Sequence, residues 1–282
     1  GQLIMLKGQF GRNTTYQFKY HNPWMWDKRK SLTLRTWLTY GELGSYNPIV
    51  NSISFRNEKR KGVDVALGWP FSYDLTTSHK LKYESVEVED TDTDYRIHSY
   101  TFGIAEDTRD VRFNPSEGHY YSYAIEQSIK WLENSLLFTR HDLILKEFIP
   151  TFEDQTIAIR GEFGYLSSPE ISNSDIFRSE WYIIGGGSTV RGYDDQYPFS
   201  FGNKRVLGSI EYRFLFTDTF QTVLFVDAGN ATNENIMDLR EYKIGKGFGI
   251  RMNIPPLGPL RLDLGIDEEE TIRIHFNIGH AF

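Results

Sequence analysis

Alternation of apolar and polar residues with a period of two is the feature that most limits how this chain can fold. It is clearest near the end, where every second residue is apolar in segments 248–254, 260–266 and, apart from His280, 272–282. Successive side chains of a β-strand point to opposite faces of its sheet, so this pattern gives each segment one apolar face. The intervening positions carry small residues and charges of both signs. The pattern predicts an all-β fold.

The same alternation recurs along the chain and predicts about fourteen strands. We expect them near residues 3–10, 14–22, 31–41, 62–70, 79–88, 95–106, 119–131, 136–148, 155–165, 205–216, 220–228, 246–254, 259–266 and 271–282. Many are about ten residues long, which is the length that a tilted strand needs to cross a bilayer. Strands of water-soluble proteins average about five or six residues. Strand length therefore favours a transmembrane barrel over a soluble sandwich, although alternation alone would suit both.

The connections between these segments alternate in length. Short connections fall at residues 149–155, 216–220 and 255–259, and long polar ones at 42–61, 166–204 and 230–246. Outer-membrane barrels have short turns on the periplasmic side and long loops outside. We therefore expect an antiparallel up-and-down transmembrane β-barrel, with the longest connection, 166–204, on the extracellular side and folded into the lumen.

Composition excludes several classes of function. Aromatic residues make up 15% of the chain, as the aromatic girdles of a membrane barrel would require. The net charge of −7, without a basic block, argues against nucleic-acid binding. The absence of cysteine excludes disulfides and thiol catalysis, and the seven histidines lack metal-ligand spacing. We expect no cofactor and no metal site.

A glycine-rich stretch, residues 185–193, lies inside the longest connection and reads GGGSTVRGY. It lacks the lysine and the following helix of a phosphate-binding loop. Arg191 within it has candidate partners, because Glu211 and Asp227 occupy the polar faces of two consecutive strands. A guanidinium between two carboxylates relieves their repulsion and fixes the loop through bidentate bonds. An exposed arginine in a mobile loop is the alternative interpretation.

These residues resemble the BamA-type outer-membrane assembly factors, whose relatives include TamA and the two-partner secretion transporters. The loop motif Val190, Arg191, Gly192 and Tyr193 resembles the family's inward-folded loop. A turn resembles another family motif through Asp107, Arg109, Asp110, Pro115 and Gly118. Residues 225–230 resemble the wall strand that receives the arginine, and residues 247–263 the penultimate hairpin. The C-terminal aromatic residue, Phe282, is similar to that of outer-membrane β-signals.

The resemblance implies a sixteen-strand barrel preceded by POTRA domains, with a seam between its first and last strands. Nascent outer-membrane proteins would pair with the open edge of that seam, here the last strand, through Ile274, Phe276, Ile278, Gly279 and Phe282. It also implies that Arg191 contacts Glu211, Phe225 and Asp227. Matching from the C-terminus makes residues 2–10 the family's third strand. We therefore expect residues 1–282 to be a barrel domain without the first two strands and the POTRA domains.

The family further implies a bacterial outer membrane, or that of a derived organelle, as the location. The implied partners are the lipid bilayer with its lipopolysaccharide, nascent outer-membrane proteins, and accessory assembly lipoproteins bound through POTRA domains. The alternatives are a secretion pore that passes a polypeptide through the lumen, or a barrel that anchors an enzyme lying outside this chain. No Gly-x-Ser-x-Gly nucleophile elbow is present, so we expect no enzyme activity in these residues.

Overall fold

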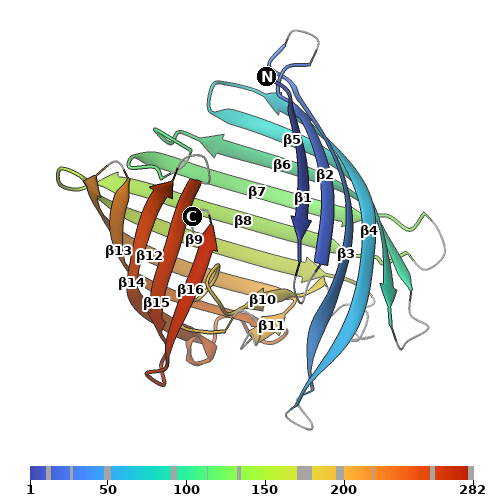
Figure 1. Cartoon of the computed structure of the whole chain (residues 1–282). Helices are drawn as coiled ribbons and strands as arrows, with labels where there is room; N and C mark the ends of the chain where they lie inside the picture. The colour runs from blue at the N-terminus through green and yellow to red at the C-terminus, as the bar shows by residue number, and fades with distance from the viewer. Residues whose placement is uncertain are drawn as a thin grey trace. The chain divides into compact units, whose positions relative to one another are not determined.

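The computed structural model is an antiparallel meander in which strands pair with their neighbours in sequence order. It describes residues 1–10, 14–25, 28–47, 52–89, 94–112, 114–131, 135–169, 180–194, 200–217, 219–254 and 258–278. A fourteen-stranded sheet runs from β1 to β9 and continues from β12 to β16, from blue to red in Figure 1. No helix in the described residues is long and apolar enough to cross a membrane.

The first nine strands precede the glycine-rich loop. They are β1 (Leu3–Gln9), β2 (Thr14–Asn22), β3 (Ser31–Asn47), β4 (Ser52–Pro70), β5 (Leu75–Val88), β6 (Tyr95–Asp107), β7 (Gly118–Ser128), β8 (Thr139–Pro150) and β9 (Gln155–Ser167). The remaining elements are β10 (Tyr182–Ile184), β11 (Ser200–Gly202), β12 (Lys204–Thr217), β13 (Phe220–Thr232), the single-turn helix η2 (Leu239–Glu241), β14 (Lys243–Ile254), β15 (Gly258–Ile266) and β16 (Ile272–Ile278).

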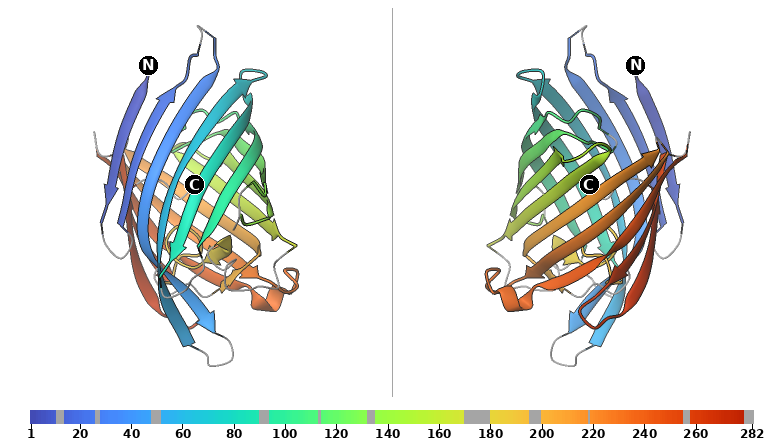
Figure 2. Two further views of the ribbon diagram at one scale, coloured as in Figure 1. Left: turned by 90° about the vertical axis from the view of Figure 1, so that its right-hand side faces the viewer. Right: turned by 90° about the vertical axis from the view of Figure 1, so that its left-hand side faces the viewer.

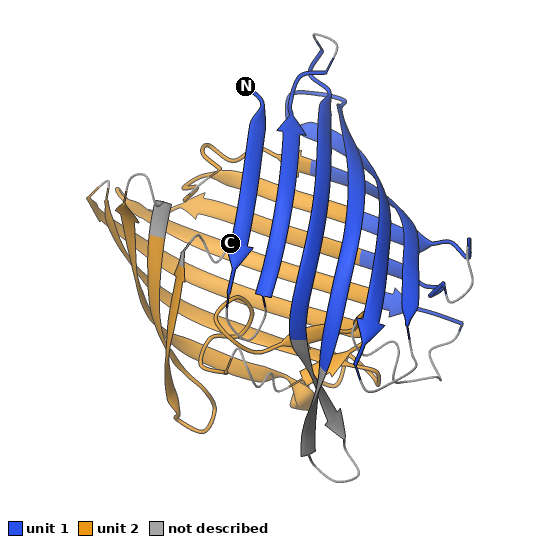
Figure 3. Ribbon diagram, turned by 45° about the vertical axis from the view of Figure 1, so that its right-hand side comes forward, with its two compact units in different colours: residues 1–105, 124–141, 166–179 blue, residues 106–123, 142–165, 180–282 orange. Residues whose placement is uncertain are grey.

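The chain divides into two compact units (Figure 3). The first comprises residues 1–105, 124–141 and 166–179, and the second comprises residues 106–123, 142–165 and 180–282. The glycine-rich loop and strands β12 to β16 all belong to the second unit.

Exposed apolar side chains and buried charges characterise the strands of the first unit. On β4, Val63 and Val65 are 41% and 39% exposed, whereas Asp64 between them is only 3% exposed. Asp64 accepts a hydrogen bond of 2.8 Å from Arg35 Nε on β3, so its buried charge is paired. A water-soluble sheet buries its apolar face, whereas a membrane strand turns that face to lipid. This inversion is the arrangement of a lipid-facing sheet.

The second unit repeats the inversion on its later strands. Ile210, Leu224 and Val226 are exposed, while Glu211 and Asp227 on the same two strands are buried. Strands β10 and β11 pair with each other and lie against β13, beside the orange strands in Figure 2. The loop that joins them therefore reaches the buried face of the main sheet.

The sequence-based boundaries were wrong in several places. Residues 42–47 and 52–61 belong to β3 and β4 and not to a loop, because the two strands stay paired to the Asn47–Ser52 register position. Backbone hydrogen bonds continue there although polar residues dilute the alternation, since a ladder does not require apolar side chains. Likewise β13 extends to Thr232 and β14 starts at Lys243, which shortens the predicted 230–246 connection. The predicted 166–204 loop contains the short strands β10 and β11.

Candidate functional site

The loop motif forms a compact turn stabilised by its own polar groups. The Gly185 N–H donates to Thr189 Oγ1 over 2.9 Å, and the Gly186 N–H donates to the Val190 carbonyl over 3.2 Å. Val190 is completely buried. Gly192 has a φ of +99°, a conformation that residues with a side chain rarely adopt. The turn therefore directs Arg191 toward the sheet.

Strands β12 and β13 present the acidic wall opposite this loop. Glu211 pairs with Phe225 in the ladder, and Ser209 pairs with Asp227, so the four side chains form adjacent rows on one face. All four are buried. The period-two geometry of two consecutive strands thus brings the Glu211 and Asp227 carboxylates to one place.

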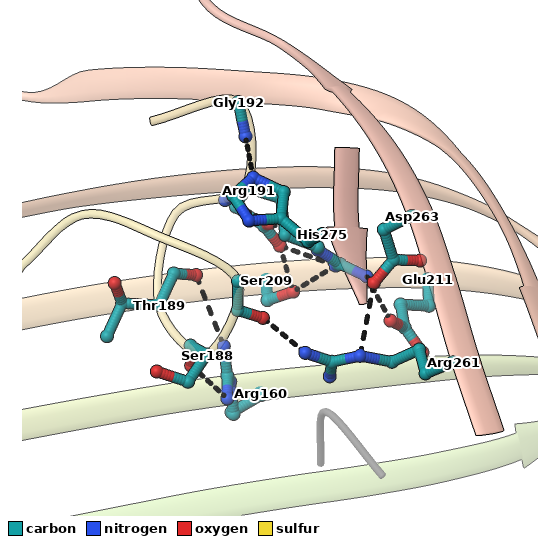
Figure 4. Close-up of polar contacts among 12 residues, drawn as sticks. Arg160, Ser188, Thr189, Arg191, Gly192, Ser209, Glu211, Arg261, Asp263 and His275 are labelled. Atoms are coloured by element: carbon teal, nitrogen blue, oxygen red, sulfur yellow. Dashed lines mark hydrogen bonds and ion pairs between the residues drawn. The ribbon is translucent and has the colours of Figure 1, made fainter. Parts of the chain in front are cut away.

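The Arg191 side chain lies between these two carboxylates (Figure 4). Its Nε and Nη2 donate to the two oxygens of Asp227 over 2.6 and 2.7 Å, and its Nη1 donates to Glu211 Oε1 over 2.7 Å. The backbone N–H of Arg191 also donates to Asp227, over 3.1 Å. Its guanidinium carbon lies 3.5 Å from the centre of the Phe225 ring, which adds a cation–π contact. Arg191 is 1% exposed, so this is a fully desolvated arginine with charged partners on two strands.

Charge compensation explains why this burial is tolerated. Burial alone lowers the pKa of Arg191, but the neighbouring carboxylates, with Asp227 the strongest, outweigh it and raise that pKa. Asp263 adds a third carboxylate, 3.6 Å from Arg191 Nη1. Other arginines pair with the same acids: Arg213 with Glu211 at 2.9 Å, and Arg251 with Asp263 at 2.6 Å. The site is a network of alternating charges on the buried face of the second unit.

Arginines of the wall also hold the loop, through its carbonyl groups. Arg160 on β9 donates to the Ser188 and Thr189 carbonyls over 3.2 and 3.4 Å, and Arg261 on β15 donates to the Gly187 carbonyl (Figure 4). The contacts are thus reciprocal, because the loop arginine binds wall carboxylates while wall arginines bind loop carbonyls.

The loop also reaches the last strand. The Gly192 N–H donates to His275 Nε2 over 3.1 Å, and the Gly192 carbonyl accepts from Arg273 Nη1 over 2.6 Å. Tyr193 is half-buried, and its hydroxyl donates to the Ile244 carbonyl over 3.5 Å. Arg273 also pairs at 2.9 Å with Asp267, in the turn before β16. Burial acts to raise the pKa of Asp267, but bonds from the Thr271 and Glu269 N–H groups and from Arg273 outweigh it and lower that pKa.

The turn motif between β6 and β7 is ordered by its acidic residues. Arg109 donates to both oxygens of Asp107, over 2.7 and 3.0 Å. Asp110 accepts from the backbone N–H groups of Val111 and Ser116 over 2.8 and 3.1 Å. Burial acts to raise the pKa of Asp110, but a hydrogen bond from the Ser116 hydroxyl, together with these backbone bonds, outweighs it and lowers that pKa. Gly118 has a φ of +93°, which closes the turn at the first residue of β7.

The Pro115 carbonyl joins this turn to the arginine network. The buried Pro115 carbonyl accepts from Arg213 Nη1 over 3.5 Å, and Arg213 pairs with Glu211. Glu211 thus binds Arg213 with one carboxylate oxygen and Arg191 with the other. The structure therefore brings the turn motif and the loop motif to one carboxylate of β12.

The residues predicted for the last strand are only partly described. The Ile274 and Phe276 side chains are exposed on the apolar face of β16, and the backbone of Ile278 pairs with Leu260. Gly279 and Phe282, and the side chain of Ile278, lie outside the described residues. Among the described residues, no cluster of three or more His, Cys, Asp or Glu side chains could hold a metal ion.

Sequence reasoning missed several members of this network. Asp263, Arg213 and His275 stand on the polar faces of their strands, as the alternation indicates. Which of them the loop touches depends on the register of β14 to β16 and on the path of the loop. Alternation along a single strand gives neither.

Comparisons with known proteins identify relatives of this chain. The family model described as the Omp85 superfamily domain matches residues 1–282. The crystal structure of BamA from Haemophilus ducreyi lacking POTRA domains 1–3 is similar with a TM-score of 0.76 at 16% identity, over 98% of this chain and 63% of that one. CdiB from Acinetobacter baumannii is similar with a TM-score of 0.63 at 15% identity, over 94% of this chain and 48% of that one.

A curated plant protein also matches. The chloroplastic outer envelope protein 80 of Arabidopsis thaliana is 32% identical over 108 residues, which are 36% of this chain and 15% of that protein. This chain therefore spans only part of the length of each of these relatives.

Proposed function

Because this chain belongs to the Omp85 superfamily, we propose that it folds and inserts client β-barrel proteins at its last strand. Members of the superfamily are transporters and assembly factors of bacterial or organellar outer membranes, and this chain is an antiparallel β-barrel of such a membrane. The proposed partners are the lipid bilayer, with lipopolysaccharide where the membrane contains it, and nascent outer-membrane proteins. Accessory lipoproteins bound through POTRA domains are a further proposed partner of the whole protein.

The observation that carries this proposal is the position of β16 at one edge of the described sheet. In the described part of the chain, β16 is a terminal strand of the sheet and pairs with β15 alone. Its apolar side chains Ile272, Ile274 and Phe276 are exposed. A strand edge offers a row of backbone donors and acceptors, and lipid cannot satisfy them. A client strand that adds to this edge satisfies those groups in a lipid environment.

The loop motif supports the proposal by holding the wall beside that edge. Arg191 binds β12 and β13, whereas Gly192 binds β16. The proposed role of Val190, Arg191, Gly192 and Tyr193 is to position this wall, with Glu211, Phe225 and Asp227 as the receiving surface. No step of covalent chemistry is required of these residues.

A secretion pore of the two-partner type is the second candidate. The likeness of the fold to CdiB favours it, since the two folds overlap over 94% of this chain. In that case a polypeptide would pass along the buried face of the sheet, beside Arg251 and Arg261, and β16 would bind no client.

Site-specific crosslinking distinguishes the two functions. A photoreactive residue replaces Ile274 or Phe276 on β16 of the full-length protein, and Arg251 or Arg261 in matched variants. We expect adducts with newly made outer-membrane proteins from the β16 positions. Adducts from Arg251 and Arg261 without adducts from β16 would contradict insertion at this strand and favour the pore. Val63, an exposed apolar residue on β4, is the control for non-specific capture.

A further inference from the structure

Gly192 of the loop motif lies between Arg191, which anchors the loop on β12 and β13, and the last strand, β16. Arg191 is bound to β12 and β13, and the residue that follows it, Gly192, is bound to β16 through both its N–H and its carbonyl. Its N–H donates to His275 Nε2 over 3.1 Å, as Figure 4 shows, and its carbonyl accepts from Arg273 Nη1 over 2.6 Å. His275 and Arg273 are two residues apart on β16, so both project to the buried face.

The atoms around Gly192 leave no room for a side chain at this position. A Cβ on Gly192 would lie 2.8 Å from the carbonyl carbon of Ile266, and a Cβ on Gly265 would meet the Gly192 nitrogen. His275 is buried, so its Nε2 has no access to bulk water as an alternative partner. Arg273 is oriented by Asp267, whose carboxylate also accepts from the Thr271 N–H at the start of β16. Both side chains are thus held toward Gly192.

These two contacts are made by side chains of β16 and not by its backbone groups. The ladder with β15, seven residue pairs from Leu260–Ile278 to Ile266–Ile272, is the backbone pairing of β16 among the described residues. A strand with one ladder opens more readily than an interior strand. The contacts to Gly192 support β16 from the buried face without occupying the groups that a further strand would use.

We propose that His275 and Arg273 are positioning residues that hold β16 against the loop motif, and so fix the edge at which a client strand pairs. The role in client pairing rests on the function proposed above. Through Gly192, the loop that Arg191 anchors on β12 and β13 also reaches the last strand.

The direction of the hydrogen bond between Gly192 and His275 shows that position 275 needs a hydrogen-bond acceptor. Nε2 of His275 accepts a hydrogen bond from the Gly192 N–H, so the ring hydrogen of the imidazole is on Nδ1. A glutamine at position 275 places an amide oxygen near the Nε2 site and preserves the acceptor. A leucine fills similar space and leaves the buried Gly192 N–H without a partner, which carries the full desolvation cost.

The test compares His275→Gln with His275→Leu in the full-length protein, with His79→Leu on β5 as the matched histidine control. Hydrogen exchange of the amides in residues 272–278 is measured together with client adducts from a photoreactive residue at position 274. In His275→Leu we expect β16 amides to exchange at least about tenfold faster and client adducts to fall. His275→Gln and His79→Leu are expected to behave like the wild type. Protease resistance of residues 185–194 is expected to stay intact in all three, because Arg191 still binds Asp227.

The outcomes separate the positioning role of His275 and Arg273 from the proposed function. Unchanged exchange and unchanged adducts in His275→Leu would overturn the positioning role, as would a His275→Gln variant that behaves like His275→Leu. Absence of client adducts in the wild type would refute the proposed function, while the exchange measurement alone still tests the positioning role. If His275→Leu does not assemble, Arg273→Met removes the second contact, and unchanged exchange in that variant overturns the proposal.

Discussion

At the scale of single residues, Arg191 shows how a buried charge can specify one loop position. Its guanidinium has five N–H donors, and Asp227, Glu211 and Ser209 accept from it within 3.4 Å. Burying an unpaired charge is expensive, so any loop position that separates Arg191 from these carboxylates is strongly disfavoured. Lysine cannot reproduce this geometry, because its ammonium is a point charge without the planar fork.

Arg191→Ala is therefore expected to release the loop and leave the strands assembled. Removing one partner of a buried ion pair costs roughly 3–5 kcal/mol, and here Asp227 and Glu211 would both lose a cation. Limited proteolysis within residues 185–194 measures the release. Arg240→Ala is the control, because Arg240 is an exposed arginine whose ion pair with Asp238 is screened by solvent. A loop in Arg191→Ala as resistant as that of the wild type would exclude the anchoring role.

The parts of this site that sequence could predict are those that depend on one strand or on two consecutive ones. Strand parity alone places Glu211 and Asp227 on one face, and the short 216–220 connection makes them neighbours. His275 could not be assigned to Gly192 in this way, because that contact joins residues 83 positions apart through the path of a folded loop. Loop paths depend on side-chain contacts that no periodicity encodes.

At the scale of the elements, β14 and β15 are shaped to let the loop backbone approach. A Cβ on Gly245 of β14 would meet the carbonyl oxygen of Arg191, and one on Gly265 of β15 would meet the nitrogen of Gly192. Both glycines lie on the buried faces of strands whose other faces are exposed and apolar. At these two positions the strands thus present backbone, without a side chain, to the motif.

Gly245→Ala is expected to displace the loop although it removes no polar contact. The added methyl group would overlap main-chain atoms, which cannot rotate away as a side chain can, and overpacking of this kind costs roughly 1–3 kcal/mol. Gly208→Ala on β12 is the matched control, because the nearest atom to its Cβ is 4.0 Å away. Proteolysis of residues 185–194 should rise for Gly245→Ala alone. Equal resistance in the two variants would show that the loop does not press on β14.

Strand boundaries were less predictable than strand existence, for a reason visible in β3 and β4. The predicted strands at 31–41 and 62–70 follow the apolar alternation, and the observed β3 and β4 continue well beyond it. Apolar alternation marks the part of a strand whose outer face meets lipid. The hydrogen-bond ladder continues wherever the two strand backbones remain adjacent. Membrane strands that extend past the bilayer are therefore underestimated by a pattern of side chains.

At the scale of the whole molecule, the network connects the two ends of the strands in the second unit. The turn between β6 and β7 reaches Arg213 through Pro115, Arg213 and Arg191 share Glu211, and Gly192 reaches His275 on β16. In a meander, the β6–β7 turn and the loop after β9 lie at opposite strand ends. One continuous polar path thus runs from this turn, through the buried wall, to the strand proposed to bind clients.

Insertion of a purified client is the most direct measurement of the central claim. The full-length protein is reconstituted in liposomes, an unfolded outer-membrane β-barrel is added, and its folded fraction is followed by heat-modifiable mobility in gels. We expect client folding well above the rate in liposomes without protein, and a rate near that background for Arg191→Ala. A wild type that does not accelerate folding, but passes an unfolded polypeptide into the liposome interior, would contradict insertion as the function.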